Sequence, residues 1–398
     1  TYILNGGAHT GMMVVPGGEL ETGFIIQTGG TNTGSISLGA PGVTAGLIGP
    51  GTYTLSNGVL EAASISEMAG CSTKIYGGEA IVSDLALNGT QDRYGDYGNS
   101  DFELNGGLLS VQTIFMPAAD FHQSGGTNQV GNVSMGHQNA ISTYTLSGGA
   151  LLGSNFTCNG TFQTFPSFSQ SGGLHTETNL SFAYSVYTLS GGQLSVSNLQ
   201  LTASTFHHTG GAFTPPSFVE FVAATWDEQA SGAQFGPLQL RYEVGATNSN
   251  LLLPSTACTV RFANSSSVAW SAPAKLIIEH WNGSLSGGGM HQIFFGTSAS
   301  GLTAQQLSLV QFSNPAGLPN GTYSARILSD GEVVPNQAIG TSVTYSTHGN
   351  NLVLTWPTGW TLQSATNVAG PYSNISGATS PYTNDMTLDP QRFFRLGQ

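Results

Sequence analysis

Apolar and polar residues alternate in a short segment that recurs through the first half of the chain. Residues 144–149 and 187–192 both read YTLSGG, and looser copies occupy residues 2–7, 53–58 and 102–107. An aromatic–polar–apolar–polar order is typical of a half-buried strand. Paired glycines can reach positive φ without a Cβ clash, so each copy predicts a strand followed by a corner.

A sister segment with phenylalanine in first place lies between these copies, at residues 24–30, 121–126, 168–173 and 206–211. Glycine pairs starting at residues 106, 125, 148, 172, 191 and 210 are spaced by 19, 23, 24, 19 and 19 residues. A period near twenty is typical of a solenoid. One coil then holds three short strands and three corners, and stacked coils form parallel sheets with a spacing of ~4.8 Å. We expect the aromatic side chains to stack in columns within the core.

Other all-β folds also repeat strands, and a propeller blade of about 40–45 residues is close to two of these coils. Here the half-repeat is itself self-similar, and the Trp-Asp and Gly-His signals of propeller blades do not recur with it. The sequence therefore predicts an all-β chain, in which a parallel β-solenoid (β-helix) precedes a β-rich region and a small antiparallel β module.

Three regions follow from the fading of the repeat. Residues 1–226 carry the solenoid repeats, residues 227–340 form a degenerate solenoid or β-rich capping region, and residues 341–398 form a small β-sandwich-like module. The core of this module is expected to consist of aromatic residues, namely Trp356, Trp360, Phe393 and Phe394. One short helix is predicted within residues 301–307, where Thr303 and Gln306 have the spacing of a capping box.

Six segments between Trp270 and Pro335 carry a family resemblance: WNG at 281–283, GGG at 287–289, QIFFG at 292–296, GLT at 301–303, GTYSA at 321–325 and GEVVP at 331–335. This stretch resembles secreted bacterial proteins with autotransporter-associated β-strand repeats. In relatives with a PEP-CTERM sorting tail, a similar stretch precedes a membrane anchor. Here a segment resembling the small C-terminal β modules of Verrucomicrobia-type secreted proteins takes its place. The resemblance implies secretion and a surface location, but no activity.

The charge distribution restricts the classes of partner that we expect the chain to bind. Only 7% of the residues are charged, and the net charge is −13. Residues 1–226 hold 13 acidic residues against two basic ones, Lys74 and Arg93. Nucleic-acid binding needs a basic stripe, and an acidic surface disfavours anionic membranes. No apolar run is long enough for a membrane-spanning helix. We therefore expect no nucleic-acid partner, no membrane insertion, and an extracellular or cell-surface location.

Catalytic signals are weak. Glycoside hydrolysis needs two carboxylates beside one bond, and a lyase needs a base for the proton. Acidic residues in the solenoid are few and several coils apart, and His207 and His208 should face opposite sides of their strand. The cysteines Cys71, Cys158 and Cys258 are expected to be small buried side chains. We predict no catalytic residues and no cofactor other than a candidate calcium ion.

That calcium candidate comes from an insertion at residues 88–101, which is the most highly charged segment of the chain. Asp92, Asp96 and Asp101 can offer the oxygen ligands that calcium prefers. The spacing differs from that of an EF-hand, and Arg93 is a competing partner for a carboxylate. The alternative is a solvated surface loop.

Nine Asn-X-Ser/Thr sequons are candidate glycosylation sites in a secreted protein. The frequency of Asn, Ser and Thr in this chain also produces such matches by chance. The asparagines are Asn88, Asn132, Asn155, Asn159, Asn179, Asn264, Asn282, Asn320 and Asn374.

We expect a structural role, as a subunit of an extracellular filament or surface layer that assembles by head-to-tail stacking. The first coil enters in mid-motif, so Tyr2, Ile3 and Leu4 are candidate assembly residues, and Phe393 and Phe394 are their counterparts near the other end. The alternative is an adhesin or polysaccharide binder, which predicts an exposed aromatic row. A carbohydrate-active enzyme is less expected.

Overall fold

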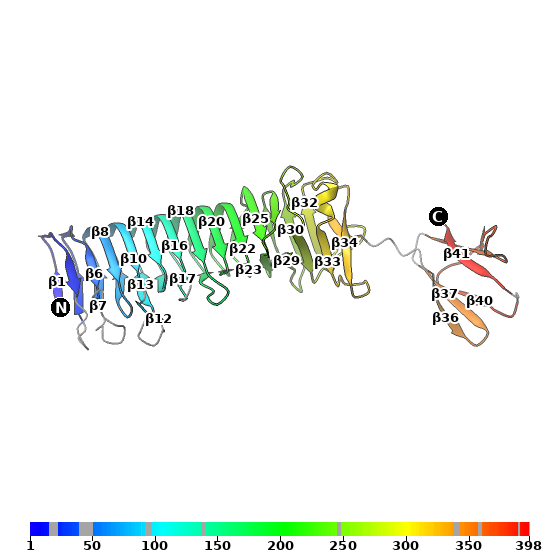
Figure 1. Cartoon of the computed structure of the whole chain (residues 1–398), viewed down its shortest axis with the longest axis horizontal. Helices are drawn as coiled ribbons and strands as arrows, with labels where there is room; N and C mark the ends of the chain where they lie inside the picture. Colours follow the sequence, from blue (N-terminus) through cyan, green and yellow to red (C-terminus); the bar gives the residue numbers. More distant parts are fainter. Residues whose placement is uncertain are drawn as a thin grey trace. The chain divides into compact units, whose positions relative to one another are not determined.

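The protein is all-β and contains a parallel β-solenoid of about 11 turns. The computed structural model describes residues 1–15, 23–39, 51–88, 90–91, 97–136, 140–244, 248–336, 343–356, 360–388 and 391–397. The chain forms two compact units, Thr1–Pro335 and Asn336–Gln398. The first unit is the solenoid, whose coils follow one another along a single axis (Figure 1). The predicted fold class is confirmed.

Sheet A has 16 strands and forms one side of the solenoid. Its strands, in spatial order, are β1 (Tyr2–Leu4), β4 (Gly23–Gln27), β7 (Gly51–Leu55), β9 (Ser72–Ile75), β13 (Ser100–Leu104), β15 (Ala119–Gln123), β17 (Thr143–Leu146), β19 (Ser167–Gln170), β21 (Val186–Leu189), β23 (Thr205–His208), β26 (Thr225–Glu228), β29 (Asn248–Leu252), β31 (Lys275–Glu279), β33 (Val310–Ser313), β34 (Thr322–Ile327) and β35 (Val333–Pro335).

Sheet B has 14 strands and faces sheet A across the core. Its strands are β2 (Ala8–His9), β5 (Thr31–Asn32), β8 (Val59–Glu67), β10 (Glu79–Leu87), β14 (Leu108–Met116), β16 (Thr127–Met135), β18 (Ala150–Asn159), β20 (Leu174–Ala183), β22 (Gln193–Thr202), β25 (Phe218–Val222) and β28 (Leu238–Arg241), with β3 (Met13–Val15), β6 (Ile36–Leu38) and β24 (Ala212–Thr214) beside this path.

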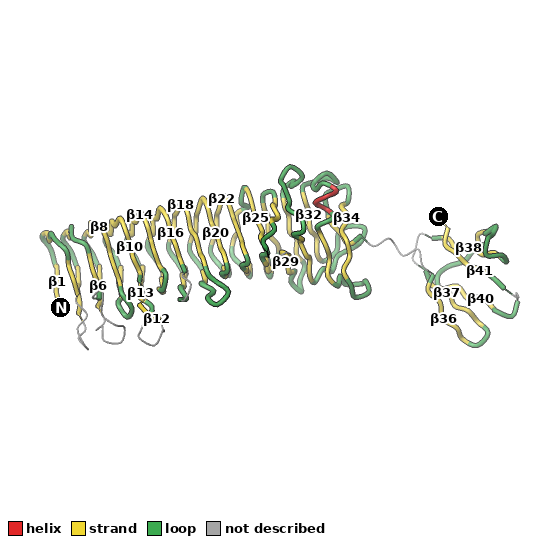
Figure 2. Tube along the Cα trace, in the orientation of Figure 1, coloured by secondary structure: helices red, strands yellow, loops and turns green. Residues whose placement is uncertain are grey.

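The remaining strands form four smaller sheets, and the helix of the described residues is α1 (Ala304–Leu307), the red segment of Figure 2. Sheet C, within the solenoid, consists of β27 (Gly232–Phe235), β30 (Cys258–Phe262) and β32 (His291–Phe295). A two-stranded pair joins β11 (Thr90–Gln91) and β12 (Tyr97–Gly98). The second unit holds β36 (Thr344–His348), β37 (Asn351–Thr355) and β40 (Tyr382–Asp385) in one sheet, and β39 (Ser373–Asn374), β38 (Thr361–Ala365) and β41 (Phe393–Gly397) in another.

Each coil has three sides, two of which are usually formed by one bent strand. In β8 the buried residues are Leu60 and Ala62, and then Ile65 and Glu67, so the period of two shifts by one residue in mid-strand. The early strands β5 and β6 show the division directly, because β5 pairs with the first half of β8 and β6 with its second half. The predicted coil of three strands is thus present, with two of them usually fused.

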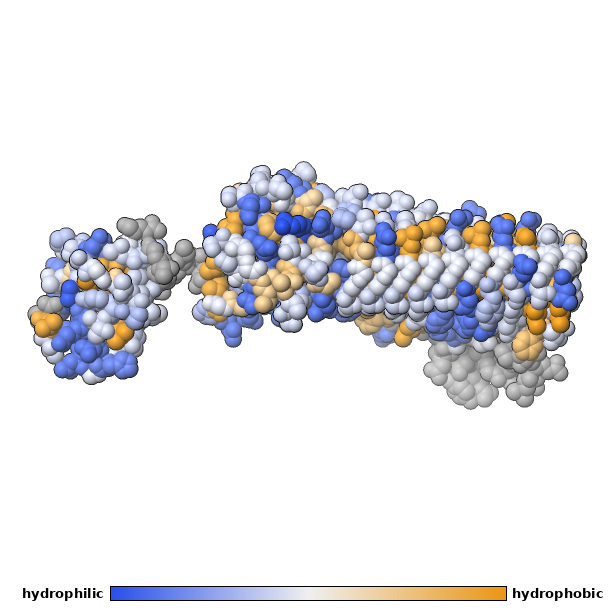
Figure 3. All heavy atoms as spheres, turned by 180° about the vertical axis from the view of Figure 1, so that it is seen from behind, coloured by the Kyte–Doolittle hydropathy of each residue, from blue (hydrophilic) through white to orange (hydrophobic). Residues whose placement is uncertain are grey.

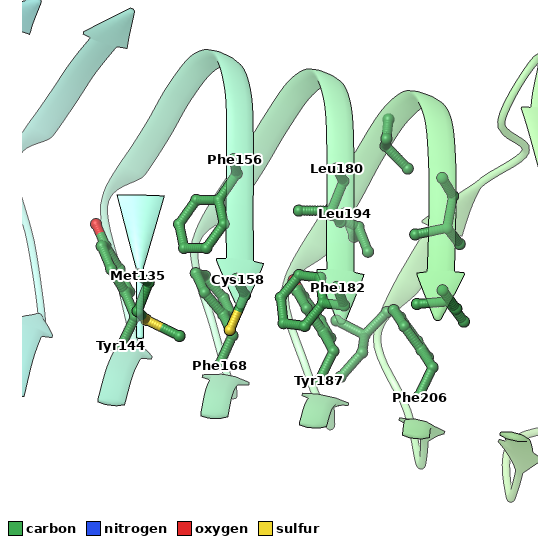
Figure 4. Close-up of a cluster of buried hydrophobic side chains, with 14 of the residues drawn as sticks. Met135, Tyr144, Phe156, Cys158, Phe168, Leu180, Phe182, Tyr187, Leu194 and Phe206 are labelled. Carbon is green, nitrogen blue, oxygen red and sulfur yellow. The ribbon is translucent and has the colours of Figure 1, made fainter. Parts of the chain in front are cut away.

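Aromatic side chains stack along the core, as the repeated motifs predict. Seven residues of sheet A occupy equivalent positions in successive coils, and their ring centroids lie 4.2–4.8 Å apart with the rings nearly parallel. All seven are fully buried, and Figure 4 shows four of them in the middle of the stack. The column contains Phe102, Phe121, Tyr144, Phe168, Tyr187, Phe206 and Trp226.

The phenylalanine copy at residues 24–30 is out of register with this column. Ile25 pairs with Tyr53 and occupies the column position, whereas Phe24 pairs with Thr52 and is 41% exposed. This copy has one residue more than the others, so counting back from its glycine pair places Ile25, not Phe24, in the core. The prediction that its aromatic residue starts the motif was therefore wrong.

The C-terminal end of the solenoid is covered by antiparallel strands. Strand β33 pairs antiparallel with β34, and β34 pairs antiparallel with β35, in which all three residues are buried. Helix α1 begins at the predicted cap, where Thr303 and Gln306 form the reciprocal bonds of a capping box. In the second unit Leu354, Trp356 and Leu362 form the core, and Trp360 and Phe394 are packed against it.

Two constraints require glycine at the corners: the backbone has a positive φ, and the neighbouring coil leaves no room for a Cβ. Gly149 has a φ of +74°, and an added Cβ would lie 2.3 Å from the carbonyl oxygen of Gly126. Gly70 has almost the same φ, +76°, but an added Cβ would meet nothing within 4 Å. Substitutions at Gly70 and Gly149 therefore separate the cost of backbone strain from the cost of crowding between coils.

We predict that Gly70→Ala lowers the free energy of unfolding by about 1 kcal/mol, through left-handed strain alone. Gly149→Ala is expected to cost at least twice as much, because the coils must also move apart. Urea unfolding of the two variants beside the parent checks this. Equal losses would contradict close stacking at the corner.

Candidate functional site

Several polar groups of the repeated segments lie inside the solenoid. In three places a tyrosine hydroxyl donates to the side-chain oxygen of a glutamine in the preceding coil. The hydroxyl–Oε1 distances are 2.8 Å for Tyr53 to Gln27, 2.7 Å for Tyr144 to Gln123 and 2.7 Å for Tyr187 to Gln170. All six side chains are buried. We call each such pair a polar rung.

Each rung also ties sheet A to sheet B. The glutamine Nε2 donates to a backbone carbonyl of the next coil at 2.9 Å, with Val59, Ala150 and Gln193 as acceptors for Gln27, Gln123 and Gln170. A buried tyrosine hydroxyl needs a partner, and the glutamine of the preceding coil supplies it. This requirement explains the order of the two segments. Each YTLSGG segment comes after a phenylalanine segment that has a glutamine two residues after its phenylalanine.

In each of two rungs, a third buried side chain contacts the tyrosine hydroxyl. Asn128 Nδ2 donates to the Tyr144 hydroxyl at 3.2 Å, and His175 Nδ1 lies 3.0 Å from the Tyr187 hydroxyl. Asn128 and His175 occupy equivalent positions in sheet B. Burial raises the pKa of both tyrosines above the ordinary value, so their hydroxyls remain donors.

We predict that Tyr187→Phe costs about 1–3 kcal/mol of unfolding free energy, because Gln170 Oε1 loses its donor in the core. The double variant Tyr187→Phe/Gln170→Leu should cost less than the sum of the two single variants. The chain already tolerates an apolar pair of this kind, Ile75 preceding Phe102. Urea midpoints of the four proteins measure the coupling, and Tyr345→Phe, at a 76% exposed residue, is the neutral control. Strict additivity would show that the rung does not couple the coils.

A second buried pair lies next to the third rung. His175 Nε2 is 3.5 Å from Glu177 Oε1, and both side chains are fully buried. The Glu177 carboxyl fills the space that Gly153 leaves in the neighbouring coil, where an added Cβ would lie 2.1 Å from Oε1. Burial raises the pKa of Glu177 to about 8 and lowers the pKa of His175 to about 3. Both groups are therefore neutral in the folded protein between these values.

This pair predicts a stability optimum in mildly acidic solution. Above pH 4.5 the unfolded chain loses the Glu177 proton that the folded protein keeps, so this group costs ~1.4 kcal/mol per pH unit up to about pH 8. Below pH 6.5 the unfolded chain protonates His175 and the folded protein does not, so stability falls towards acid. Between pH 4.5 and 6.5 the two slopes cancel.

Unfolding midpoints measured from pH 4 to 9 check this profile. Glu177→Gln should remove the alkaline loss while keeping the acid loss. His175→Asn, which copies Asn128, should do the opposite. An unchanged alkaline slope in Glu177→Gln would show that other groups set it.

The outer surface carries a ladder of asparagines at the bend of the long strands. Asn155 donates to Asn132 at 2.9 Å, Asn179 to Asn155 at 2.7 Å and Asn198 to Asn179 at 2.8 Å, each through side-chain amides. On the face seen in Figure 3, pale rows of residues of intermediate hydropathy run across the solenoid. Three glycosylation candidates, Asn132, Asn155 and Asn179, are members of the ladder. A glycan on Asn155 or Asn179 would occupy the nitrogen that makes the ladder bond.

The other six glycosylation candidates lie elsewhere in the fold. Asn159 is the last residue of β18, Asn374 lies in β39, and the others follow strands or lie in loops. Asn264 Oδ1 accepts from the backbone and hydroxyl of Ser266. The candidates outside the ladder are Asn88, Asn159, Asn264, Asn282, Asn320 and Asn374.

The calcium candidate is only partly within the described residues. Asp92 and Asp96 lie outside them, and Asp101 lies within strand β13 rather than in a loop. Its neighbour Asp120 is engaged by Asn99 and Thr143, and His122 Nε2 lies 3.8 Å from Asp101 Oδ1. In the described part of the chain no three His, Cys, Asp or Glu residues are grouped as metal ligands.

The candidate assembly residues lie in strands. Tyr2, Ile3 and Leu4 form β1, which pairs with β4. Tyr2 and Ile3 are 45% and 55% exposed, and Leu4 is buried. Phe393 and Phe394 begin β41, the outer strand beside β38, and both are half-buried. The three cysteines are buried and free, as predicted.

The histidine pair behaves as strand geometry predicts. His207 faces outward and lies 2.8 Å from Asp227, whereas His208 faces the core and contacts Glu228. The aromatic column is internal, so it offers no exposed stacking row. Sequence patterns missed the place of Asn198 in the asparagine ladder and the burial of the Glu177 carboxyl, because neither residue belongs to the repeated motif. None of the helices in the described segments has the length and apolarity to cross a membrane.

No family model matches the sequence, and comparisons with curated proteins and with solved structures find no significant match. The functional argument is therefore based on the fold and on the placement of its polar groups.

Proposed function

We propose that the protein is a secreted structural subunit of an extracellular filament or surface layer, without a catalytic role. The observation that carries the proposal is the uninterrupted, in-register stack of sheet A from β1 to β33. Backbone ladders, stacked rings and buried rungs all run along the same axis, so every coil is fixed to the next. Such a fully paired stack is mechanically suited to a rod that resists heat and proteases.

The surface and the sequence resemblance agree with an extracellular setting. The outer faces carry ladders of neutral polar side chains, and strongly polar groups such as Gln170, Glu177 and Glu228 are inside. The resemblance of residues 270–335 to secreted autotransporter-associated repeat proteins, with relatives of the PEP-CTERM type, points to the same location. The resemblance of the segment after Pro335 to C-terminal modules of Verrucomicrobia-type secreted proteins does so too. These resemblances support the proposal without defining a partner.

Free strand edges provide a means of head-to-tail assembly. In the second unit β36 and β41 are outer strands, and all five residues of β36 are exposed. An outer strand can add to the edge of a sheet in a second molecule, such as the β1 edge of sheet A. If further coils precede Thr1 in a longer chain, the receiving edge belongs to the first of them. Contacts of this heterologous kind do not close and produce a filament.

Electron microscopy of the purified chain tests the proposal. We expect filaments whose axial repeat matches the length of one molecule. Ser346→Lys, in the outer strand β36, should abolish them by placing a charge at the pairing edge. Thr355→Lys is the matched control, because Thr355 is exposed on the same face but lies in the central strand β37.

Discrete rods at high protein concentration would refute assembly by this chain. Filaments that persist in Ser346→Lys would show that β36 is not the contact.

A further inference from the structure

A gap in the backbone ladder separates sheet B from sheet C. In the described residues β24 pairs with β22 and β27 pairs with β30, but β24 and β27 do not pair with each other. The Cα atoms of these two strands nevertheless approach within 8 Å. A hollow of about 400 Å³ opens at this place.

The hollow is too narrow for an inserted strand. A strand between two others needs twice the strand spacing, about 9.6 Å from one flanking strand to the other. The flanking strands here are closer than that. The volume instead falls within the range of small-molecule sites, about 300–1,000 Å³.

The walls differ in chemistry. Phe213 and Pro215 form an apolar wall, while Ser231, Gln234 and Thr259 provide hydroxyl and amide groups. Arg261 supplies a positive charge, and no carboxylate lines the hollow. This composition is unusual in a chain with a net charge of −13.

His208 also lines the hollow, and Glu228 holds its ring in place from behind. His208 Nδ1 lies 3.0 Å from the Glu228 carboxylate, which also accepts from Trp226 Nε1 at 3.0 Å and from the Ala230 backbone at 3.1 Å. His208 is 3% exposed, and its Nε2 is closed to solvent. His208 therefore forms part of the floor of the hollow and makes no hydrogen bond to a ligand.

Arg261 remains available for an anion. Its guanidinium lies over the ring of Phe294, 3.8 Å from the centroid, and no carboxylate of the described residues lies within ion-pair distance. By contrast, Lys74 is bound to Glu103 and Arg241 to Glu220. The Glu332 carboxyl is near enough to feel the charge of Arg261 but forms no ion pair with it. An arginine supported by an aromatic ring and without an ion-paired carboxylate is well suited to a ligand carboxylate.

We infer that the hollow between β24 and β27 binds a sugar acid, a single hexuronate unit. Arg261 pairs with the carboxylate, and the hydroxyls and amide of the walls meet the ring hydroxyls. Phe213 and Pro215 contact the C–H face of the ring. The site is independent of filament assembly, so either proposal can fail without the other.

Calorimetric titration of the full chain with glucuronate and galacturonate tests the site, with glucose and galactose as neutral counterparts at the same pH and salt. We expect binding of at least one uronate and at least tenfold weaker binding of the neutral sugars. Arg261→Gln should weaken uronate binding at least tenfold, and Arg261→Lys should weaken it less. Arg241→Gln, an arginine outside the hollow, is the control and should leave binding unchanged.

Three outcomes would overturn the inference. The first is the absence of binding by either uronate at millimolar concentration. The second is equal affinity for uronates and neutral sugars, which would remove the role of Arg261. The third is uronate binding that survives Arg261→Gln, which would place the site elsewhere. A melting-temperature measurement on each variant separates loss of binding from loss of fold.

Discussion

Strict register between coils is the constraint on which the rest of the structure depends. At the glycine-pair corners that follow the repeat strands of sheet A, the backbone of one coil touches the backbone of the next, as at Gly149 above Gly126. Only glycine fits that approach, so the corners fix the position of every following residue. Equivalent side chains then fall directly above one another, which produces the ring column inside and the asparagine ladder outside.

Because the coils are in register, buried polar groups in the thin core can find hydrogen-bond partners. A tyrosine hydroxyl in one coil finds a glutamine in the coil before it because the two positions are fixed, as with Tyr187 and Gln170. The glutamine then bonds to a backbone carbonyl across the core. The alternation of tyrosine segments with glutamine-containing phenylalanine segments is therefore a hydrogen-bonding requirement and not only a packing preference.

Local patterns in the sequence were sufficient for the fold class, the aromatic column and the capping box at Thr303, because each depends on neighbours at fixed spacing. The role of Gln170 depends on a residue 17 positions away, and the bend of β8 shifts the period without a glycine to mark it. Phe24 was misplaced because one extra residue precedes its glycine pair. Glu177 could not be located from the sequence, since its burial depends on the space beside Gly153.

Irregular positions in the columns coincide with changes in the coil. Thr73 interrupts the rings between Tyr53 and Phe102, and nearby Glu67 takes an apolar position between Leu38 and Leu87, where burial raises its pKa. The column ends at Trp226, and there His208 and Glu228 replace the rung while sheet B gives way to sheet C. In the regular rungs the tyrosine, glutamine and backbone groups satisfy one another, so a break in the repeat is where polar groups become free to meet a ligand. The hollow beside Arg261 lies at such a break, so a ligand bound there, as we propose, would leave the stacking of the coils intact.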